Sequence, residues 1–86
     1  MNVLLLSRGE VEALLPMDSC IPLMRGALVS LADGLVHQPL RTIVRPPDAA
    51  GLMGLMPAYS SGARPAFALK AICVFPGNAA RGKDSH

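Results

Sequence analysis

The spacing of apolar residues changes from a helical to a strand period near residue 38 of the 86-residue chain. At the N-terminus, Val3–Leu6 is an aliphatic run that predicts a short strand. Ser7 and Glu10 are three residues apart and match a capping box, in which each side chain satisfies a free backbone amide at a helix start. We therefore expect a first helix that ends near Leu15, because Pro16 cannot continue it.

A second amphipathic helix is predicted after Pro16. Asp18 is a suitable N-cap, and Pro22 would then fall in the first turn, where backbone amides have no acceptor within the helix. Gly34 is a suitable terminator, because glycine adopts the left-handed conformation that often ends helices. Apolar residues recur at steps of three and four and predict one apolar face, formed by Ile21, Met24, Leu28, Leu31 and Leu35.

From Gln38 the period is two, which is typical of a strand that ends at a Pro46–Asp48 turn. A second strand is expected over Gly51–Met56, closed by Pro57, and the short connection predicts an antiparallel hairpin. After a loop at 60–65, Ala66–Phe75 is predicted as the third long strand and as the most buried one. In the strand that begins at Gln38, one face holds Leu40, Thr42 and Val44. The other face holds Arg41, Ile43 and Arg45.

These elements predict an α+β fold in the order β-α-α-β-β-β, with helices packed on one face of a largely antiparallel sheet. The chain is short enough for one domain at most, and so small a domain has little core. Yet 51% of the residues are hydrophobic and only 16% are charged. We therefore expect an incomplete domain whose apolar surface meets a partner.

Composition narrows the classes of function. The net charge is +2 with basic residues scattered along the chain, which argues against a nucleic-acid partner. Cys20 and Cys73 have no metal-ligand spacing and are expected to be buried free thiols in a reducing, cytoplasmic setting. No apolar run approaches the roughly 18 residues that a membrane helix needs, and the N-terminus lacks a basic signal-peptide region.

Two cations interrupt apolar strand faces and are the candidate binding residues. Lys70 shares its expected face with Ala66 and Ala68, whose small side chains leave room for a ligand beside the ammonium group. Arg41 shares its face with Ile43, and its planar guanidinium group suits a carboxylate. Together they would form an anion clamp. The alternative for Lys70 is an edge position from which its charge reaches water.

Other candidate motifs are weaker. Arg45 lies on the same face as Arg41 and is a rival for its role, although a solvated strand end is the simpler interpretation. The segment 77–85 resembles a phosphate-binding loop, but Asp84 stands where a magnesium-binding hydroxyl should be, and Gly82 is better explained as loop. No G-x-G-x-x-G motif is present, so these residues predict no dinucleotide site.

Several segments together resemble the ornithine cyclodeaminase/mu-crystallin family. They are SRGEVEALLPM, QPLRTIVR, GLMGLMPAYS, LKAICVFPGN and the closing DSH, in this order and at similar spacing. The resemblance covers residues 1–86 and implies the N-terminal part of a substrate-binding and dimerisation domain, without the Rossmann domain that binds NAD or NADP. It also implies a homodimer.

The resemblance implies that Arg41 and Lys70 bind the carboxylate of a small amino, imino or keto acid. The implied chemistry is NAD(P)-dependent hydride transfer, as in ornithine cyclodeaminases, ketimine reductases and alanine dehydrogenases. Ornithine-specific members have a carboxylate two residues before Met-Pro, where this chain has Gly54, so ornithine is disfavoured. No catalytic or cofactor-binding residue is expected within 1–86, and these residues alone are expected to be inactive. The alternative is a noncatalytic module for small-anion binding or dimerisation.

Overall fold

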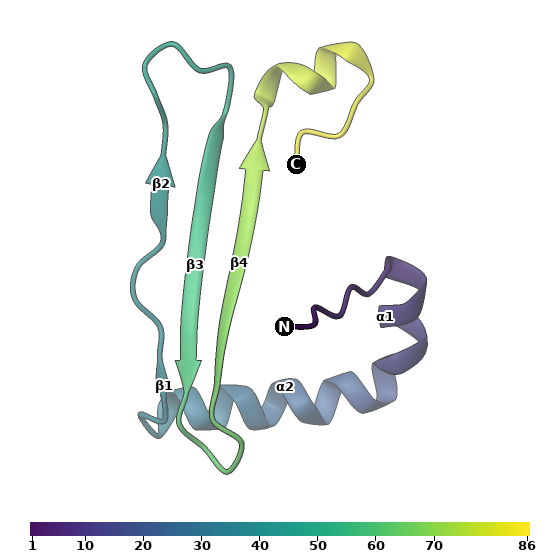
Figure 1. Ribbon diagram of the computed structural model, residues 1–86, viewed down its shortest axis with the longest axis vertical. Helices are drawn as coiled ribbons and strands as arrows, with labels where there is room; N and C mark the ends of the chain where they lie inside the picture. Colours follow the sequence, from purple (N-terminus) through teal and green to yellow (C-terminus); the bar gives the residue numbers. More distant parts are fainter. The chain divides into compact units, whose positions relative to one another are not determined.

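A computed structural model describes all 86 residues as two units, Met1–Asp33 and Gly34–His86. The first unit contains two α-helices and the second contains a four-stranded antiparallel sheet followed by a 3-10 helix (Figure 1). This content confirms the predicted α+β class with an open, incomplete sheet. The packing of the helices on one face of the sheet stays a prediction.

Helix α1 spans Arg8–Leu14 and begins with the predicted capping box. The Ser7 backbone N–H donates to Glu10 Oε2 at 2.6 Å, and the Glu10 backbone N–H donates to Ser7 Oγ at 3.3 Å. Hydrogen bonds from Ser7 hold the pKa of Glu10 below its ordinary value. The backbone N–H of Ser7 has the larger effect and its side chain the smaller one. The helix start is thus fixed by local hydrogen bonds.

The lowered pKa of Glu10 predicts a pH-dependent cap. A carboxylate whose pKa is depressed by folding stabilises the helix above its ordinary pKa, and this contribution is lost as the pH falls through the lowered value. Ser7→Ala removes the hydroxyl but keeps the backbone N–H, so we expect the pKa of Glu10 to rise part of the way toward its ordinary value. An NMR titration of the Glu10 carboxyl carbon measures this shift; an unchanged midpoint would contradict the capping role of the hydroxyl.

Helix α2 spans Met17–Ala32, and its N-cap is Pro16 instead of the expected Asp18. The Pro16 carbonyl oxygen already accepts hydrogen bonds from Ser19 and Cys20, at 3.0 and 2.9 Å, so the helix starts two residues earlier than predicted. Asp18 lies in the first turn, where its negative charge stabilises the helix by interacting with the helix dipole. Pro22 consequently lies inside the helix and not in its first turn, which corrects the sequence-based assignment.

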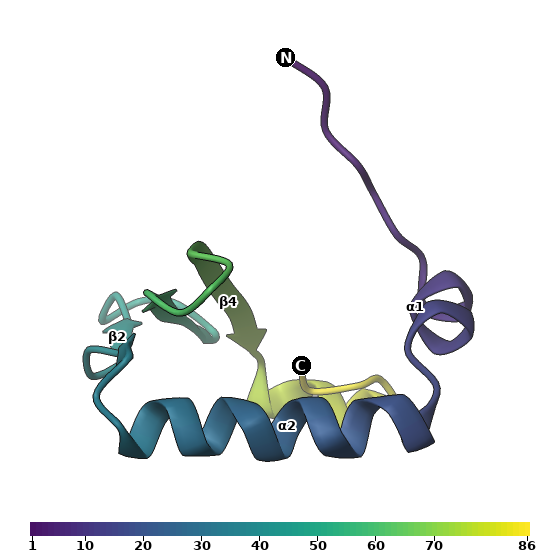
Figure 2. The ribbon, with the colours of Figure 1, turned by 90° about the horizontal axis from the view of Figure 1, so that it is seen from below.

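The predicted strand at Val3–Leu6 is wrong. These four residues carry no regular secondary structure, and their side chains are exposed. A strand requires hydrogen bonds to a neighbour, which an aliphatic run cannot specify by itself. Figure 2 shows this segment running as extended chain into α1.

No single helix is long and apolar enough to span a membrane. Helices α1 and α2 meet that requirement only as a pair, and they are bent by 81° at the break between them.

The C-terminal end of α2 agrees with the prediction, because Gly34 follows at a φ of 76°. Its predicted apolar face is present but exposed, as at Leu28, which is 67% exposed.

The sheet has strand β3 at its centre. Strand β4 pairs along the whole of one edge of β3, and the short strands β1 and β2 pair successively along the other edge (Figure 1). All pairings are antiparallel, which confirms the predicted hairpin. The bounds are β1 Val36–His37, β2 Thr42–Val44, β3 Leu52–Ser60 and β4 Ala66–Val74.

The edge strand formed by β1 and β2 is interrupted by one extra residue. His37 pairs with Tyr59 and Thr42 pairs with Leu55. Four residues, 38–41, therefore oppose only three residues of β3, 56–58. This two-for-one count defines a β-bulge, which leaves part of the ladder unpaired. The uninterrupted strand predicted from Gln38 is thus divided into two by the Gln-Pro-Leu-Arg segment.

Strand β3 does not end at Pro57, as the sequence suggested, but continues to Ser60. On one side, Pro57 pairs with Leu69 of β4. On its other side, toward β1 and β2, it lies opposite the bulge. The ladder is already interrupted there, so the missing proline N–H removes no hydrogen bond from that edge. The bulge thereby makes a proline acceptable in the central strand.

The sheet buries few side chains. Gly54 is the only buried residue, and strand β4, expected to be the most buried, is instead a mostly exposed edge strand. The two cysteines are free, but Cys20 is only half-buried and Cys73 is exposed. The expectation of buried thiols is therefore wrong.

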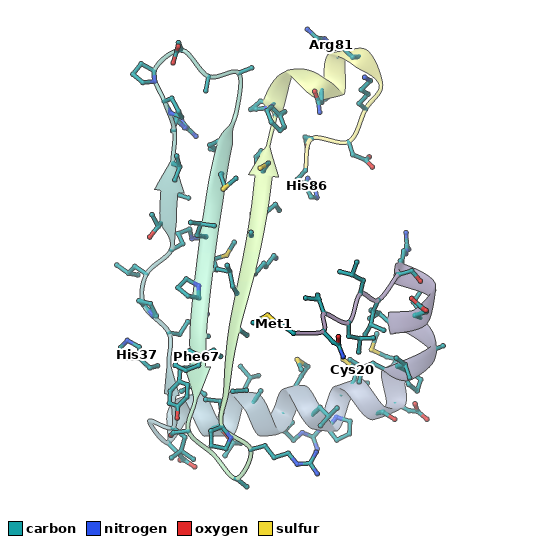
Figure 3. All side chains as sticks on the ribbon, viewed as in Figure 1. Met1, Cys20, His37, Phe67, Arg81 and His86 are labelled. Carbon is teal, nitrogen blue, oxygen red and sulfur yellow. The ribbon has the colours of Figure 1, made fainter.

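Residues Pro76–Arg81 form the 3-10 helix η1, where the sequence suggested loop. The Phe75 N–H donates to the Ser85 carbonyl at 2.7 Å, and the Asn78 side-chain amide donates to the Asp84 carbonyl at 2.9 Å. Gly82 ends the helix at a φ of 68°. Arg81 and His86 mark this closed C-terminal turn in Figure 3.

Candidate carboxylate-binding site

The pairing register places Arg41 and Lys70 in one row across the sheet. Lys70 on β4 pairs directly with Met56 on β3. Arg41 precedes Thr42, which pairs with Leu55, so the next position along β3 opposite Arg41 is Met56. Residues opposite one another in an antiparallel sheet lie on the same face. Extending the β2 register by one residue thus gives the row Arg41–Met56–Lys70, with both candidate cations on one face.

The distance across this row suits a shared ligand. If the β2 register is continued by one residue to Arg41, two strand spacings of about 4.7 Å separate the outer members. Both cations are exposed, and both have long flexible side chains that can approach each other over Met56. Lys70 is exposed on the edge strand β4, which agrees with the alternative of a solvated edge lysine, and the shared row is also compatible with the predicted clamp. Binding of a carboxylate there stays a prediction.

The bulge opens a pocket beside Arg41. The pocket has a volume of about 230 Å³ and is open to solvent. Met56 forms its lining on the β3 side, and the remaining lining comes from Gln38, Pro39, Leu40 and Arg41. Because the bulge residues leave the ladder, the chain bows away from β3 and creates this space. The Gln-Pro-Leu-Arg segment thus shapes a cavity next to a cation.

No carboxylate neutralises the row. The strands contain no Asp or Glu, and the only ion pair in the structure joins Arg8 and Glu12 on α1 at 3.0 Å. The neighbouring row on one side is Ala58 and Ala68, and the row on the other side is apolar around Gly54. Two exposed cations with no acidic partner in the strands keep their hydrogen-bond donors free for an external anion.

Arg45, the rival for the binding role, lies elsewhere on this face. It follows Val44, which pairs with Met53, and so lies two rows from Met56. Its side chain lines a different pocket of about 180 Å³, formed mainly by the β2–β3 connection and Pro76. The structure therefore brings Arg41 and Lys70 into one row and leaves Arg45 outside it.

The opposite face of the sheet is aromatic at one end. His37 pairs with Tyr59, and Tyr59 pairs with Phe67. The Tyr59 and Phe67 rings are 4.6 Å apart, and a mainly apolar pocket of about 120 Å³ lies beside them. His37 and Phe67 both lie at the β1 end of the sheet in Figure 3. No cation of the Arg41–Lys70 row takes part in this pocket.

Sequence reasoning missed two features of the site. Met56 was named only as the end of a predicted strand, but it lies between the two cations and lines the pocket. Gln38 was used only to mark the start of a strand, but it lines the same pocket. Met56 could have been found by counting a register through the β2–β3 turn. The pocket could not, because it depends on the bulge.

The residues of this chain do not fit a nicotinamide dinucleotide. Such sites use a glycine-rich turn between a parallel strand and an α-helix. Here every strand pairing is antiparallel, and β4 leads into a six-residue 3-10 helix that starts with Pro76. No group of three or more His, Cys, Asp or Glu residues is arranged to hold a metal ion.

Comparison with known proteins defines the class. The model of the ornithine cyclodeaminase/mu-crystallin family matches residues 1–86, and the chain belongs to this family. Among curated proteins, it is similar to the ketimine reductase mu-crystallin of Rattus norvegicus, with 36% identity over 85 residues. The match covers 94% of this chain and 27% of the relative, so the chain spans about a quarter of that protein's length. No solved structure matches it significantly.

Proposed function

We propose that this chain supplies the carboxylate-binding surface for NAD(P)-dependent hydride transfer on a small amino, imino or keto acid. Arg41 and Lys70 would both bind the substrate carboxylate. The observation that carries this proposal is the single row Arg41–Met56–Lys70, which is next to an open pocket. Family membership supports the type of chemistry.

The two cations would have different tasks. The planar guanidinium group of Arg41 can donate two parallel hydrogen bonds to a carboxylate and so fix its orientation. The ammonium group of Lys70 approaches from the other side of Met56 and adds charge without a fixed plane. A carboxylate held from two sides keeps the adjacent carbon in one place. Such orientation contributes to the rate of a reaction at that carbon.

Hydride transfer requires a nicotinamide, and the residues described here form no site for one. We therefore assign this chain the binding and orientation of the substrate, and no chemical step. The name of the rat relative refers to ketimine reduction, which favours imino acids within the proposed class. Gly54, on the same face as Met56, offers no carboxylate to a second amine, which disfavours ornithine. The homodimer implied by the family resemblance remains part of this proposal.

Titration of the purified chain with pyruvate and with methyl pyruvate tests the proposal. The two compounds have nearly the same carbon skeleton, but the ester has no negative charge. We expect calorimetry to detect pyruvate binding that weakens as salt is added, and to detect at least about tenfold weaker binding of the ester, because a hydrogen bond to a charged group contributes about 1.5 to 3 kcal/mol. Equal binding of acid and ester, or no binding of pyruvate, would refute the carboxylate site.

A further inference from the structure

Met56 belongs both to the cation row and to the bulge pocket, and it lies between the two cations of that row. It pairs directly with Lys70, and it lines the pocket together with Arg41. Its side chain is half-buried, while both cations are exposed. A ligand that contacts the two charged groups at once would therefore lie over Met56.

We propose that Met56 contacts the ligand and determines its specificity, by forming the apolar floor under the carbon chain next to the carboxylate. The inference rests on the proposed function, because it takes Arg41 and Lys70 as the groups that bind the carboxylate. It goes further by assigning the part of the ligand that lies between them. The residue would act by direct contact, without any chemical step of its own.

The neighbourhood of Met56 supports this role. A Cβ atom at Gly54 would lie 3.8 Å from Met56 Cε, so the methionine side chain extends along β3 toward the glycine. The same position would lie 3.4 Å from Ile72 Cγ2 and 3.6 Å from Ile43 Cδ1. The thioether thus lies next to two aliphatic side chains. An unbranched, flexible methionine can adjust to the shape of an apolar group placed on it.

This floor selects a class of ligand. An aliphatic or cyclic carbon chain next to the carboxylate would lose water against Met56, which is favourable. A second ammonium group would instead lie near Arg41 and Lys70 with no acidic residue in the strands to pair with it. The inferred ligands are therefore short aliphatic or cyclic amino, imino or keto acids with no positive charge on the side chain.

The first test compares Met56→Glu with Met53→Glu. Both residues are on β3, but Met53 is three residues away and faces the other side of the sheet, where it is 40% exposed. A glutamate at position 56 would pair with the two cations and repel the ligand. By calorimetry with pyruvate, we expect Met56→Glu to weaken binding at least about 30-fold and Met53→Glu to change it less than about threefold, since an opposite charge within reach neutralises both cations.

Met56→Ala provides a second test that does not depend on added charge. Shortening this side chain deepens the floor, so the ratio of the pyruvate Kd to the 2-oxopentanoate Kd should rise by about fivefold or more, as expected when an apolar cavity admits about two further CH₂ groups. Circular dichroism spectra show whether each variant keeps its strands. The ratio is insensitive to a simple loss of folded protein, because both ligands report on the same sample.

The outcomes separate this inference from the proposed function. If wild-type chain does not bind pyruvate, or binds its methyl ester equally well, the carboxylate site itself is wrong and the role of Met56 is refuted with it. If pyruvate binding depends on the carboxylate but Met56→Glu and Met53→Glu have equal effects, only the role of Met56 is overturned. An unchanged chain-length ratio in Met56→Ala overturns it as well.

Discussion

Replacing Arg41 and Lys70 together with alanine is expected to abolish pyruvate binding measurable by calorimetry. Each single replacement should weaken binding at least about tenfold, because each removes one charged hydrogen-bonding group, worth about 1.5 to 3 kcal/mol, from the carboxylate. The two cations lie in one row with Met56 between them, and no acidic residue in the strands pairs with them. Their loss should therefore affect ligand binding more than the stability of the fold. The two effects should not be additive, because both groups bind the same carboxylate.

Arg45→Ala is the matched control for this prediction. It removes the same charge from the same face, but from a position two rows away and in a different pocket. We expect a change in pyruvate affinity below about twofold at moderate salt, since screening weakens interactions between exposed charges beyond about 10 Å. If Arg45→Ala weakens binding as much as Arg41→Ala, the effect is one of overall charge and the row is not the site.

Gly51→Ala is expected to produce the largest loss of stability in the sheet. A Cβ atom at Gly51 would collide with the Val74 carbonyl oxygen and would lie 2.5 Å from Phe75 Cδ1. The first of these is backbone, held by the Leu52–Val74 pair at the start of β3, so it cannot move aside without breaking the β3–β4 ladder. We expect the free energy of unfolding to fall by about 2 to 3 kcal/mol, as for overpacked sites. Urea denaturation followed by circular dichroism measures the change.

Gly54→Ala is the corresponding control in the same strand. The nearest atoms to its new Cβ are side-chain methyl groups at 3.4 and 3.6 Å, which is ordinary van der Waals contact. The φ angle of Gly54 is not positive, so an alanine meets no backbone strain. We expect a change in unfolding free energy below about 1 kcal/mol. Equal destabilisation by the two substitutions would show that the close approach at Gly51 is not what limits the sheet.

Elements fixed by neighbours in the sequence were predicted well. The capping box at Ser7 and Glu10 and the helix end before Gly34 both depend on groups within a few residues of each other. The β2–β3 hairpin likewise follows from the turn that starts at Pro46, where the Ala49 N–H donates to the Pro46 carbonyl at 3.2 Å. Asp18 failed as an N-cap because the Pro16 carbonyl takes the first helical hydrogen bonds. Propensity alone does not decide between two nearby starting points.

Two predictions that depend on a distant partner were wrong. Val3–Leu6 has the composition of a strand, but no strand pairs with it. The same limit applies to Pro57, which looked like a terminator and instead lies within β3, opposite the bulge. A ladder is a property of two segments, so the apolar content of one of them cannot establish it.

The sequence by itself determined which residues could serve the site and the class of the fold: cations at positions 41 and 70 in apolar strands, and alternation that gives each strand two faces. Only the tertiary structure decided that Arg41, Met56 and Lys70 share a row and that a pocket opens beside them. The physical reason is that alternation fixes a face within one strand, whereas the alignment between strands depends on the hydrogen-bond register and on the single extra residue in 38–41.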